Sequence, residues 1–402
     1  MKKKLLITMC LSVSTLIFLL SAPSYAGIKD GVTNDLAKIG VMVDMTGPTS
    51  NVGVLMALAY RNLVSDINDR GGIHGRKISL IIEDNRYSIP LHISAFKKLV
   101  FKDSVFAIMG PVSVGGSRVL FKDIQKNQIP TLPWTPDDSL KVPYKRYVLP
   151  VNGFYDTEVG VIFDYIVNTL KPKNLKLAFL TFDVESGMRM KELVKKWADV
   201  FGITDIDYEV IPMAVIDVTS QVLTMQRARA THLFIHHVAP GVSATLKDMK
   251  RFGFVVPTFG SSAACTEDIM RIAGEATKSF IGATSYSSWH EDYPGMKRAR
   301  NISMKYNPNA KASYPNRSYL YGWVLAEVLF EGMTKAGKDL DREKLVDALE
   351  TMRNFDTKGL SSPITYTPTM HYGMTMVKLV KTDPPNQRFI PVTDWKSEPS
   401  TK

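Results

Sequence analysis

Short apolar runs alternate with longer amphipathic segments along this chain, and no other feature of the sequence constrains its fold as strongly. In the first half, runs rich in Val and Ile have the length of buried strands, at 38–44, 78–83, 105–109 and 129–132. Segments with helical spacing follow the first three of them, at 52–70, 88–102 and 117–127. Strands that alternate with helices form parallel sheets with helices on both faces. We therefore predict a first doubly wound α/β lobe.

The same alternation starts again after residue 153. Strands are predicted at 175–181, 207–212, 231–236 and 257–259, and helices at 159–170, 187–201, 220–229, 245–252 and 318–336. The segment 364–395 indicates strands and turns, and only the short stretch Pro150–Gly153 separates the two series. In open α/β sheets ligands bind beyond the carboxyl ends of the strands. Two lobes that face each other predict a small-molecule site in the cleft between them.

The first 26 residues have the pattern of a cleavable secretory signal peptide. Three lysines at 2–4 precede an apolar run from Leu5 to Leu20, and small residues lead to Ala26. We predict cleavage after Ala26 and an exported, periplasmic protein. A membrane anchor is the alternative, but the run is shorter than the roughly 20 residues of a membrane span. Cys10 lies too early in the run, and in too poor a context, for a lipoprotein.

Composition and charge exclude several classes of protein. Hydrophobic residues make up 45% of the 402 residues and charged residues 22%, which excludes a disordered chain, a collagen-like fibre and a disulfide-rich miniprotein. Removing three lysines with the signal peptide lowers the net charge from +11 to +8. These charges are scattered, so nucleic acid is not an expected partner, although a mild positive field favours anionic ligands. Cys265 is the only cysteine of the mature chain, so no intramolecular disulfide is expected.

Motifs for catalysis and for metal binding are weak. The sequence has no Gly-x-Ser-x-Gly nucleophile elbow and no phosphate-binding Walker loop. Gly71–Arg76 is rich in glycine, but it follows a helix and precedes a strand, which is typical of a turn. His236 and His237 are adjacent at a strand end and point to opposite sides, and no third ligand is evident. They either contact a cleft ligand or pack in the fold. We expect no metal, no cofactor and no enzyme activity.

Two loops after predicted strands carry candidate ligand-binding residues. The first contains Val112 and Ser113 and opens a helix, whose N-terminal N–H groups favour a carboxylate. Helix capping is the alternative role of Ser113, with equal weight. The second loop contains Trp134 and Thr135. Trp134 either stacks on a ligand or packs between the lobes.

An ordered series of short motifs resembles one known family. The motifs are Ile39–Val41, Met45–Pro48, Gly71–Ile78, Val105–Pro111, Asp217–Gln221, Val256–Gly260, Asp356–Leu360 and His371–Gly373. Together they run over nearly the whole mature chain, and it resembles the leucine/isoleucine/valine-binding family, the type I periplasmic solute-binding proteins of ABC transporters. The resemblance implies two doubly wound parallel-sheet lobes joined by a three-crossing hinge.

The resemblance also implies where the lobes divide. The crossings are expected near 150–153, 281–284 and 354–357. Lobe 1 then takes 27–150 and 284–353, lobe 2 takes 151–283 and 354–402, and 1–26 is the signal peptide.

The departures from the family pattern bear on the ligand. Ser186 stands where the family has the tyrosine of a Tyr-Gly pair, and Ser262 stands where amino-acid-binding members carry the acidic residue that holds the α-ammonium. Burying an ammonium without such a partner costs several kcal/mol. A small aromatic or aliphatic carboxylate without an ammonium therefore fits better. Expected contacts are Trp134 and Tyr155 for stacking, and hydroxyls and an imidazole for hydrogen bonds, from Ser113, Thr135, Ser186, Ser262 and His236 or His237.

The functional expectation is a monomeric exported protein that captures a small amino acid or organic carboxylate and delivers it to an inner-membrane ABC permease. One alternative is a ligand-sensing subunit of a membrane signalling receptor. A less favoured alternative is an exported enzyme.

Overall fold

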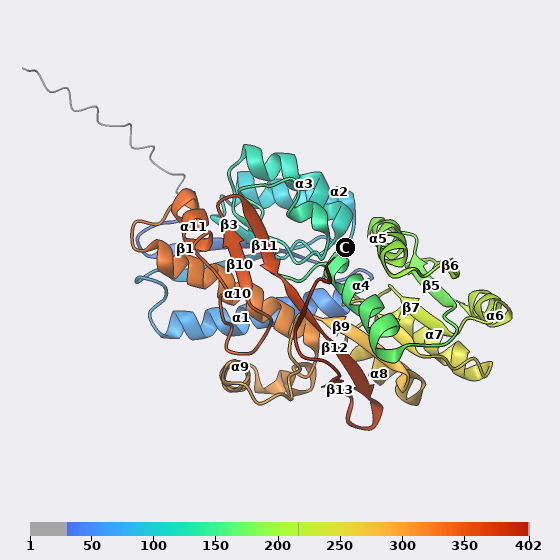
Figure 1. The fold of residues 1–402 in the computed structure, drawn as a ribbon. Coiled ribbons are helices and arrows are strands. Elements are labelled where there is room, and N and C mark those ends of the chain that lie inside the picture. Colours follow the sequence, from blue (N-terminus) through green and yellow to red (C-terminus); the bar gives the residue numbers. More distant parts are fainter. Residues whose placement is uncertain (1–29, 216, 401–402) are drawn as a thin grey trace, which may run out of the picture.

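The computed structural model describes residues 30–215 and 217–400, which form two α/β lobes side by side (Figure 1). The predicted signal peptide lies outside the described residues. The sheet of the first lobe has the strand order β2-β1-β3-β4 and is parallel throughout. Its strands are β1 (Leu36–Val43), β2 (Lys77–Asp84), β3 (Ala107–Met109) and β4 (Thr131–Leu132). Both this sheet and its strand positions agree with the predicted first series.

Helices from both ends of the chain cover the first sheet. They are α1 (Ser50–Asp69), α2 (Ile89–Lys97), α3 (Val114–Lys126), α9 (Pro294–Tyr306), α10 (Arg317–Ala336) and α11 (Arg342–Leu349). The long helix α10 packs along α1, where Gly322 admits the backbone of Met56. Residues 286–374 therefore complete the core that residues 37–154 begin.

The second lobe is built on a larger mixed sheet with the order β13-β12-β9-β8-β7-β5-β6. Its strands are β5 (Leu177–Phe182), β6 (Ile206–Ile211), β7 (His232–Ile235), β8 (Thr258–Gly260), β9 (Phe280–Thr284), β12 (Met376–Asp383) and β13 (Arg388–Pro391), with β14 (Lys396–Ser397) paired to β12. The strands β5 to β9 are parallel, and β12 joins them antiparallel. The helices are α4 (Tyr155–Asp164), α5 (Glu185–Phe201), α6 (Thr219–Arg227), α7 (Ala239–Arg251) and α8 (Asp268–Ala273).

The buried cores show where the chain passes between lobes. Phe154 packs in the first core and Tyr155 in the second, and the chain returns between Ala283 and Tyr286. The last passage differs from the expected position near 354–357. The hairpin of β10 (Ile364–Thr367) and β11 (Met370–Met374) still packs on the first lobe, because Ile364, Tyr366 and Met374 are buried in its core. The third crossing therefore lies between Met374 and Val377.

Among the described residues, no helix is both long enough and apolar enough to cross a membrane.

Candidate functional site

A cavity lies between the lobes, at the carboxyl ends of strands from both sheets. The first lobe contributes loops after β3 and β4, and the second contributes loops after β5, β7 and β8. The cavity has a volume of about 50 Å³. Its position is the one that open α/β sheets favour for ligands.

Seven of the nine residues predicted for the site line this cavity: Val112, Ser113, Trp134, Thr135, Tyr155, Ser186 and Ser262. The two histidines do not. His236 lies behind Tyr155, with 4.8 Å between the ring centroids, and its Nδ1 is 2.7 Å from Ser261 Oγ. His237 is turned away, with Nε2 3.2 Å from the Pro212 carbonyl oxygen. The expectation that one of them is a direct polar contact therefore has no support in the geometry, and both are packed in the fold.

Of the two roles that the sequence left open for Ser113, the structure shows helix capping. Its side-chain oxygen accepts a hydrogen bond from the Gly116 N–H at 3.1 Å, which caps α3. A serine hydroxyl that accepts one bond still has a proton to donate. The N-terminus of α3 therefore presents a hydroxyl and a partial positive charge at the cavity wall, which suits an anionic group.

Trp134 and Thr135 are fixed by the protein and shape the wall. The Trp134 ring stacks on Tyr321, with centroids 4.3 Å apart and planes 20° apart, and its Nε1–H donates to the Tyr286 hydroxyl at 3.1 Å. The Thr135 hydroxyl donates to the Pro111 carbonyl oxygen at 3.0 Å. One face of the indole is thus covered by Tyr321, and Trp134 also lines the cavity.

Two buried hydroxyl oxygens on the cavity wall have no hydrogen-bond partner among the described residues, Thr266 Oγ1 and Tyr321 Oη, while the Ser186 hydroxyl faces Tyr87 and the Ser262 hydroxyl faces Glu158. A buried polar atom without a partner costs roughly 1–3 kcal/mol, so native proteins contain few of them. Their concentration on one wall marks the cavity as a place where a polar ligand supplies the missing bonds.

Among the described residues that line the cavity, none is Asp, Glu, Lys or Arg. One carboxyl lies behind the wall. Glu158 is 1% exposed, and its Oε2 accepts the Ser262 N–H at 2.8 Å. Burial raises the pKa of Glu158 to about 8, so this carboxyl is mostly neutral at pH 7. The wall thus offers a ligand hydroxyls and aromatic rings, and no full negative charge.

Polar contacts across the interface hold the lobes closed around the cavity. Arg118 on α3 pairs with Glu185 on α5, and Asn51 Nδ2 donates to Asp268 Oδ2 at 3.0 Å. These contacts join residues of opposite lobes.

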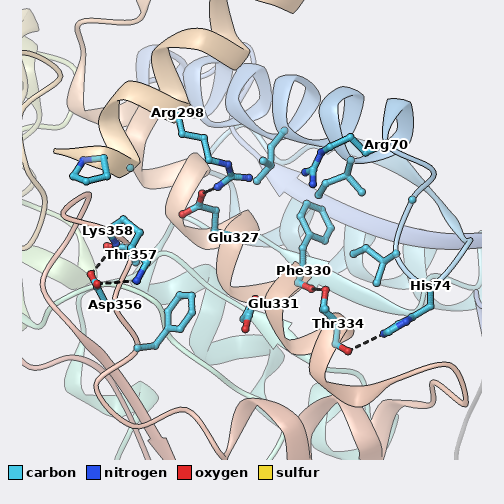
Figure 2. Close-up of a pocket in the computed structure, with 17 residues that line it drawn as sticks. Arg70, His74, Arg298, Glu327, Phe330, Glu331, Thr334, Asp356, Thr357 and Lys358 are labelled. Carbon is cyan, nitrogen blue, oxygen red and sulfur yellow. Dashed lines mark hydrogen bonds and ion pairs between the residues drawn. The ribbon is translucent and has the colours of Figure 1, made fainter. Parts of the chain in front are cut away.

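A larger hollow lies within the first lobe, between α1, α9, α10 and the loop 355–358 (Figure 2). Two ion pairs join residues that line it, Arg298 with Glu327 and Lys358 with Asp356 at 3.2 Å, while Arg70 and Glu331 pair with Asp66 and Lys335 outside it. His74 Nε2 lies 2.8 Å from the Thr334 carbonyl oxygen. None of the predicted site residues lines this hollow, and its pairing leaves little for a ligand to satisfy.

Sequence reasoning missed several residues of the interlobe wall, notably Tyr87, Phe182, Thr266 and Tyr321. Tyr321 lies inside an apolar helix, where an aromatic residue indicates core packing. Tyr87 lies in the loop after β2 with φ +56°, a conformation that the sequence does not indicate. The described residues contain no cluster of three or more His, Cys, Asp or Glu side chains that is suited to a metal ion.

Comparisons with known proteins agree with this architecture. The family model for the periplasmic binding protein matches residues 37–387. The Leu/Ile/Val-binding protein BraC3 of Rhizobium johnstonii is 22% identical over 79% of this chain and 84% of its own length. A branched chain amino acid ABC transporter protein of Thermus thermophilus, solved with bound valine, superposes with TM-score 0.85 at 23% identity, over 91% of this chain and 97% of that one.

A fatty acid ABC transporter substrate-binding protein of Thermomonospora curvata has the same fold, with TM-score 0.79 at 21% identity over 93% of this chain and 96% of that one. The family model covers well over half of the chain, and the two lobes with their cleft have the architecture it describes. The chain belongs to the periplasmic binding protein family, a family of non-enzymatic binding proteins.

Proposed function

We propose that this chain binds a small organic carboxylate without an α-ammonium group in the interlobe cavity. The observation that carries the proposal is the chemistry of the wall, which combines hydroxyls and aromatic rings and has no ionised acid among its described residues. Ser113 and the N-terminus of α3 receive the carboxylate, and Tyr155, Phe182 and Trp134 surround the apolar body.

An amino acid is the competing ligand, because the protein from Thermus thermophilus holds valine. Its ammonium would need a buried anionic partner, and losing hydration without one costs several kcal/mol. Glu158 is a poor partner, because its carboxyl is mostly neutral at pH 7 and Ser262 separates it from the cavity. The fatty acid ABC transporter substrate-binding protein of Thermomonospora curvata supports the choice of a carboxylate without an ammonium.

The proposed function also includes delivery of the ligand to a membrane permease. After cleavage behind Ala26 the chain acts as a monomer in the periplasm, where lobe closure traps the ligand and presents both lobes to an inner-membrane ABC permease. Hinge closure around a ligand is the known motion of periplasmic binding proteins.

Thermal-shift measurements on residues 27–402 test the ligand class with matched pairs. Leucine is compared with 4-methylpentanoate, and phenylalanine with 3-phenylpropanoate, because the members of each pair differ only in the ammonium. A ligand at 100 times its Kd adds about 2.7 kcal/mol of stability. We expect a rise in Tm of a few degrees with a member of the carboxylate series and none with the amino acids. Stabilisation by leucine or phenylalanine alone would overturn the proposal.

A further inference from the structure

Arg317, the first residue of α10, crosses from the first lobe into the second. Its side chain is fully buried. Nη1 donates to the Cys265 carbonyl oxygen at 3.1 Å and lies 3.0 Å from the Cys265 Sγ, and the guanidinium is 4.7 Å from the Phe389 ring centroid. The Arg317 backbone N–H donates to Glu267 Oε2 at 2.7 Å. Cys265 and Phe389 belong to the core of the second lobe.

The contacts of Arg317 lie directly beside the ligand cavity. Thr266, between its partners Cys265 and Glu267, lines the cavity, and so does Tyr321, one helical turn after Arg317. The same two short segments therefore form both the cavity wall and the interlobe contact. A ligand that draws Thr266 and Tyr321 together also brings Arg317 to Cys265.

The guanidinium is only partly satisfied in this position. Nε and Nη2 have no hydrogen-bond partner among the described residues, and Nη2 is 4.0 Å from Glu267 Oε1. Burying a charged group whose bonds are incomplete is costly. Burial of the charge therefore opposes this contact, while the bonds to Cys265 favour it.

We propose that Arg317 is an interlobe latch that holds the closed arrangement and covers the Cys265 thiol, so that the reactivity of this thiol reports lobe opening. Arg317 is a positioning residue here, since it acts on ligand retention without lining the cavity. Cys265 is 0% exposed, with Arg317 on one side and Gly282 of its own lobe on another. The inference needs no ligand, so its test is separate from that of the proposed ligand class.

The experiment is the rate of Cys265 alkylation by N-ethylmaleimide in native residues 27–402, for the wild type, Arg317→Met and Arg317→Lys. We expect Arg317→Met to react about tenfold faster, since it loses its charge-assisted bonds across the interface. Arg317→Lys keeps the charge with fewer bonds and should be intermediate. The matched control is Arg251→Met, because Arg251 is exposed on α7 and lies 5.2 Å from the ring centroid of Phe252 in its own lobe.

Loss of the Arg317 charge slows the alkylation of Cys265, whereas exposure of the thiol speeds it, so the two effects can be told apart. Burial raises the pKa of Cys265 to about 12, while the positive charge of Arg317 lowers it. Removing Arg317 disfavours the reactive thiolate, so a faster reaction comes from exposure. Thermal unfolding of each variant separates opening from loss of the fold. An unchanged rate in folded Arg317→Met, or a wild-type rate equal to that of the urea-unfolded chain, would overturn the latch.

Discussion

Glu158 shows how burial and one hydrogen bond set the chemistry of the cavity wall. Its pKa of about 8 lies above the ordinary value of 4.5, because burial disfavours the charged form. Between pH 4.5 and about pH 8 the Glu158 carboxyl therefore keeps its proton in the folded chain and loses it in the unfolded chain. More protons in the folded state mean that the free energy of unfolding falls as the pH rises through this window.

Glu158→Gln tests this balance. An amide cannot ionise, and its carbonyl oxygen can still accept the Ser262 N–H. We expect the wild type to lose about 1 kcal/mol of stability per pH unit between roughly pH 5 and pH 8 relative to the variant. Urea unfolding across that range measures the difference. Parallel pH profiles for the two proteins would show that Glu158 ionises normally.

We expect Ser262 to decide whether the cavity binds a carboxylate or an amino acid. Ser262→Glu places a carboxylate on the wall, where it repels an anionic ligand and offers a partner to an ammonium. We expect binding of 4-methylpentanoate to weaken at least about tenfold, by the loss of roughly one charged interaction. Ser262→Gln is the control for size, and calorimetric titration is the measurement. Equal losses in both variants would mean that volume, and not charge, decides.

The N-terminus of α3 links an element of the fold to ligand binding. Ser113→Ala removes the cap, which costs about 1 kcal/mol of stability, and it also removes a hydroxyl from the cavity wall. Asp341→Ala is the matched control, because Asp341 caps α11 in the same way, by accepting the Lys344 N–H at 2.8 Å, and does not line the cavity. We expect similar losses in urea unfolding and weaker carboxylate binding only for Ser113→Ala. Unchanged binding in Ser113→Ala would remove the helix N-terminus from the site.

The sequence predicted most of the alternating helices and strands, because each buried strand and each amphipathic helix has its own periodicity. The strands from β1 to β8 were all expected. By contrast α8, β9, α9 and α11 were not identified. β9 (Phe280–Thr284) carries two small residues in a short run, Gly282 and Ala283, and β12 covers its open edge antiparallel. Pairing at long range, which a local pattern does not contain, makes it a strand.

The hinge is a property of the whole molecule, since three distant segments meet there. The Ser285 hydroxyl donates to the Met376 carbonyl oxygen at 3.0 Å, and a Cβ on Gly153 would lie 2.0 Å from the same Ser285 Oγ. Gly153→Ala should therefore destabilise the chain by about 1–3 kcal/mol through overpacking. Ser285→Gly should recover part of this loss in the double variant, measured by urea unfolding as a double-mutant cycle. If the changes in the free energy of unfolding of the two single variants simply add in the double variant, Gly153 and Ser285 do not interact sterically.

The same long-range geometry explains which parts of the site the sequence could indicate. Ser113, Trp134, Ser186 and Ser262 follow predicted strands, and the carboxyl ends of parallel strands meet at one edge, so their convergence could be expected. Tyr321 and Thr266 reach the wall only because α10 meets the second lobe, which depends on the hinge. The third crossing was misplaced for a related reason, since the hairpin of β10 and β11 gives no local sign of which core it joins.

The ligand class of the interlobe cavity is tested most directly by a calorimetric titration of residues 27–402 with leucine and with 4-methylpentanoate. The two molecules share the branched chain and the carboxylate, and they differ in the ammonium. We predict that 4-methylpentanoate binds at least about tenfold more tightly, because the cavity wall has no anionic partner for an ammonium. Tighter binding of leucine would contradict the account and would make the chain an amino-acid carrier.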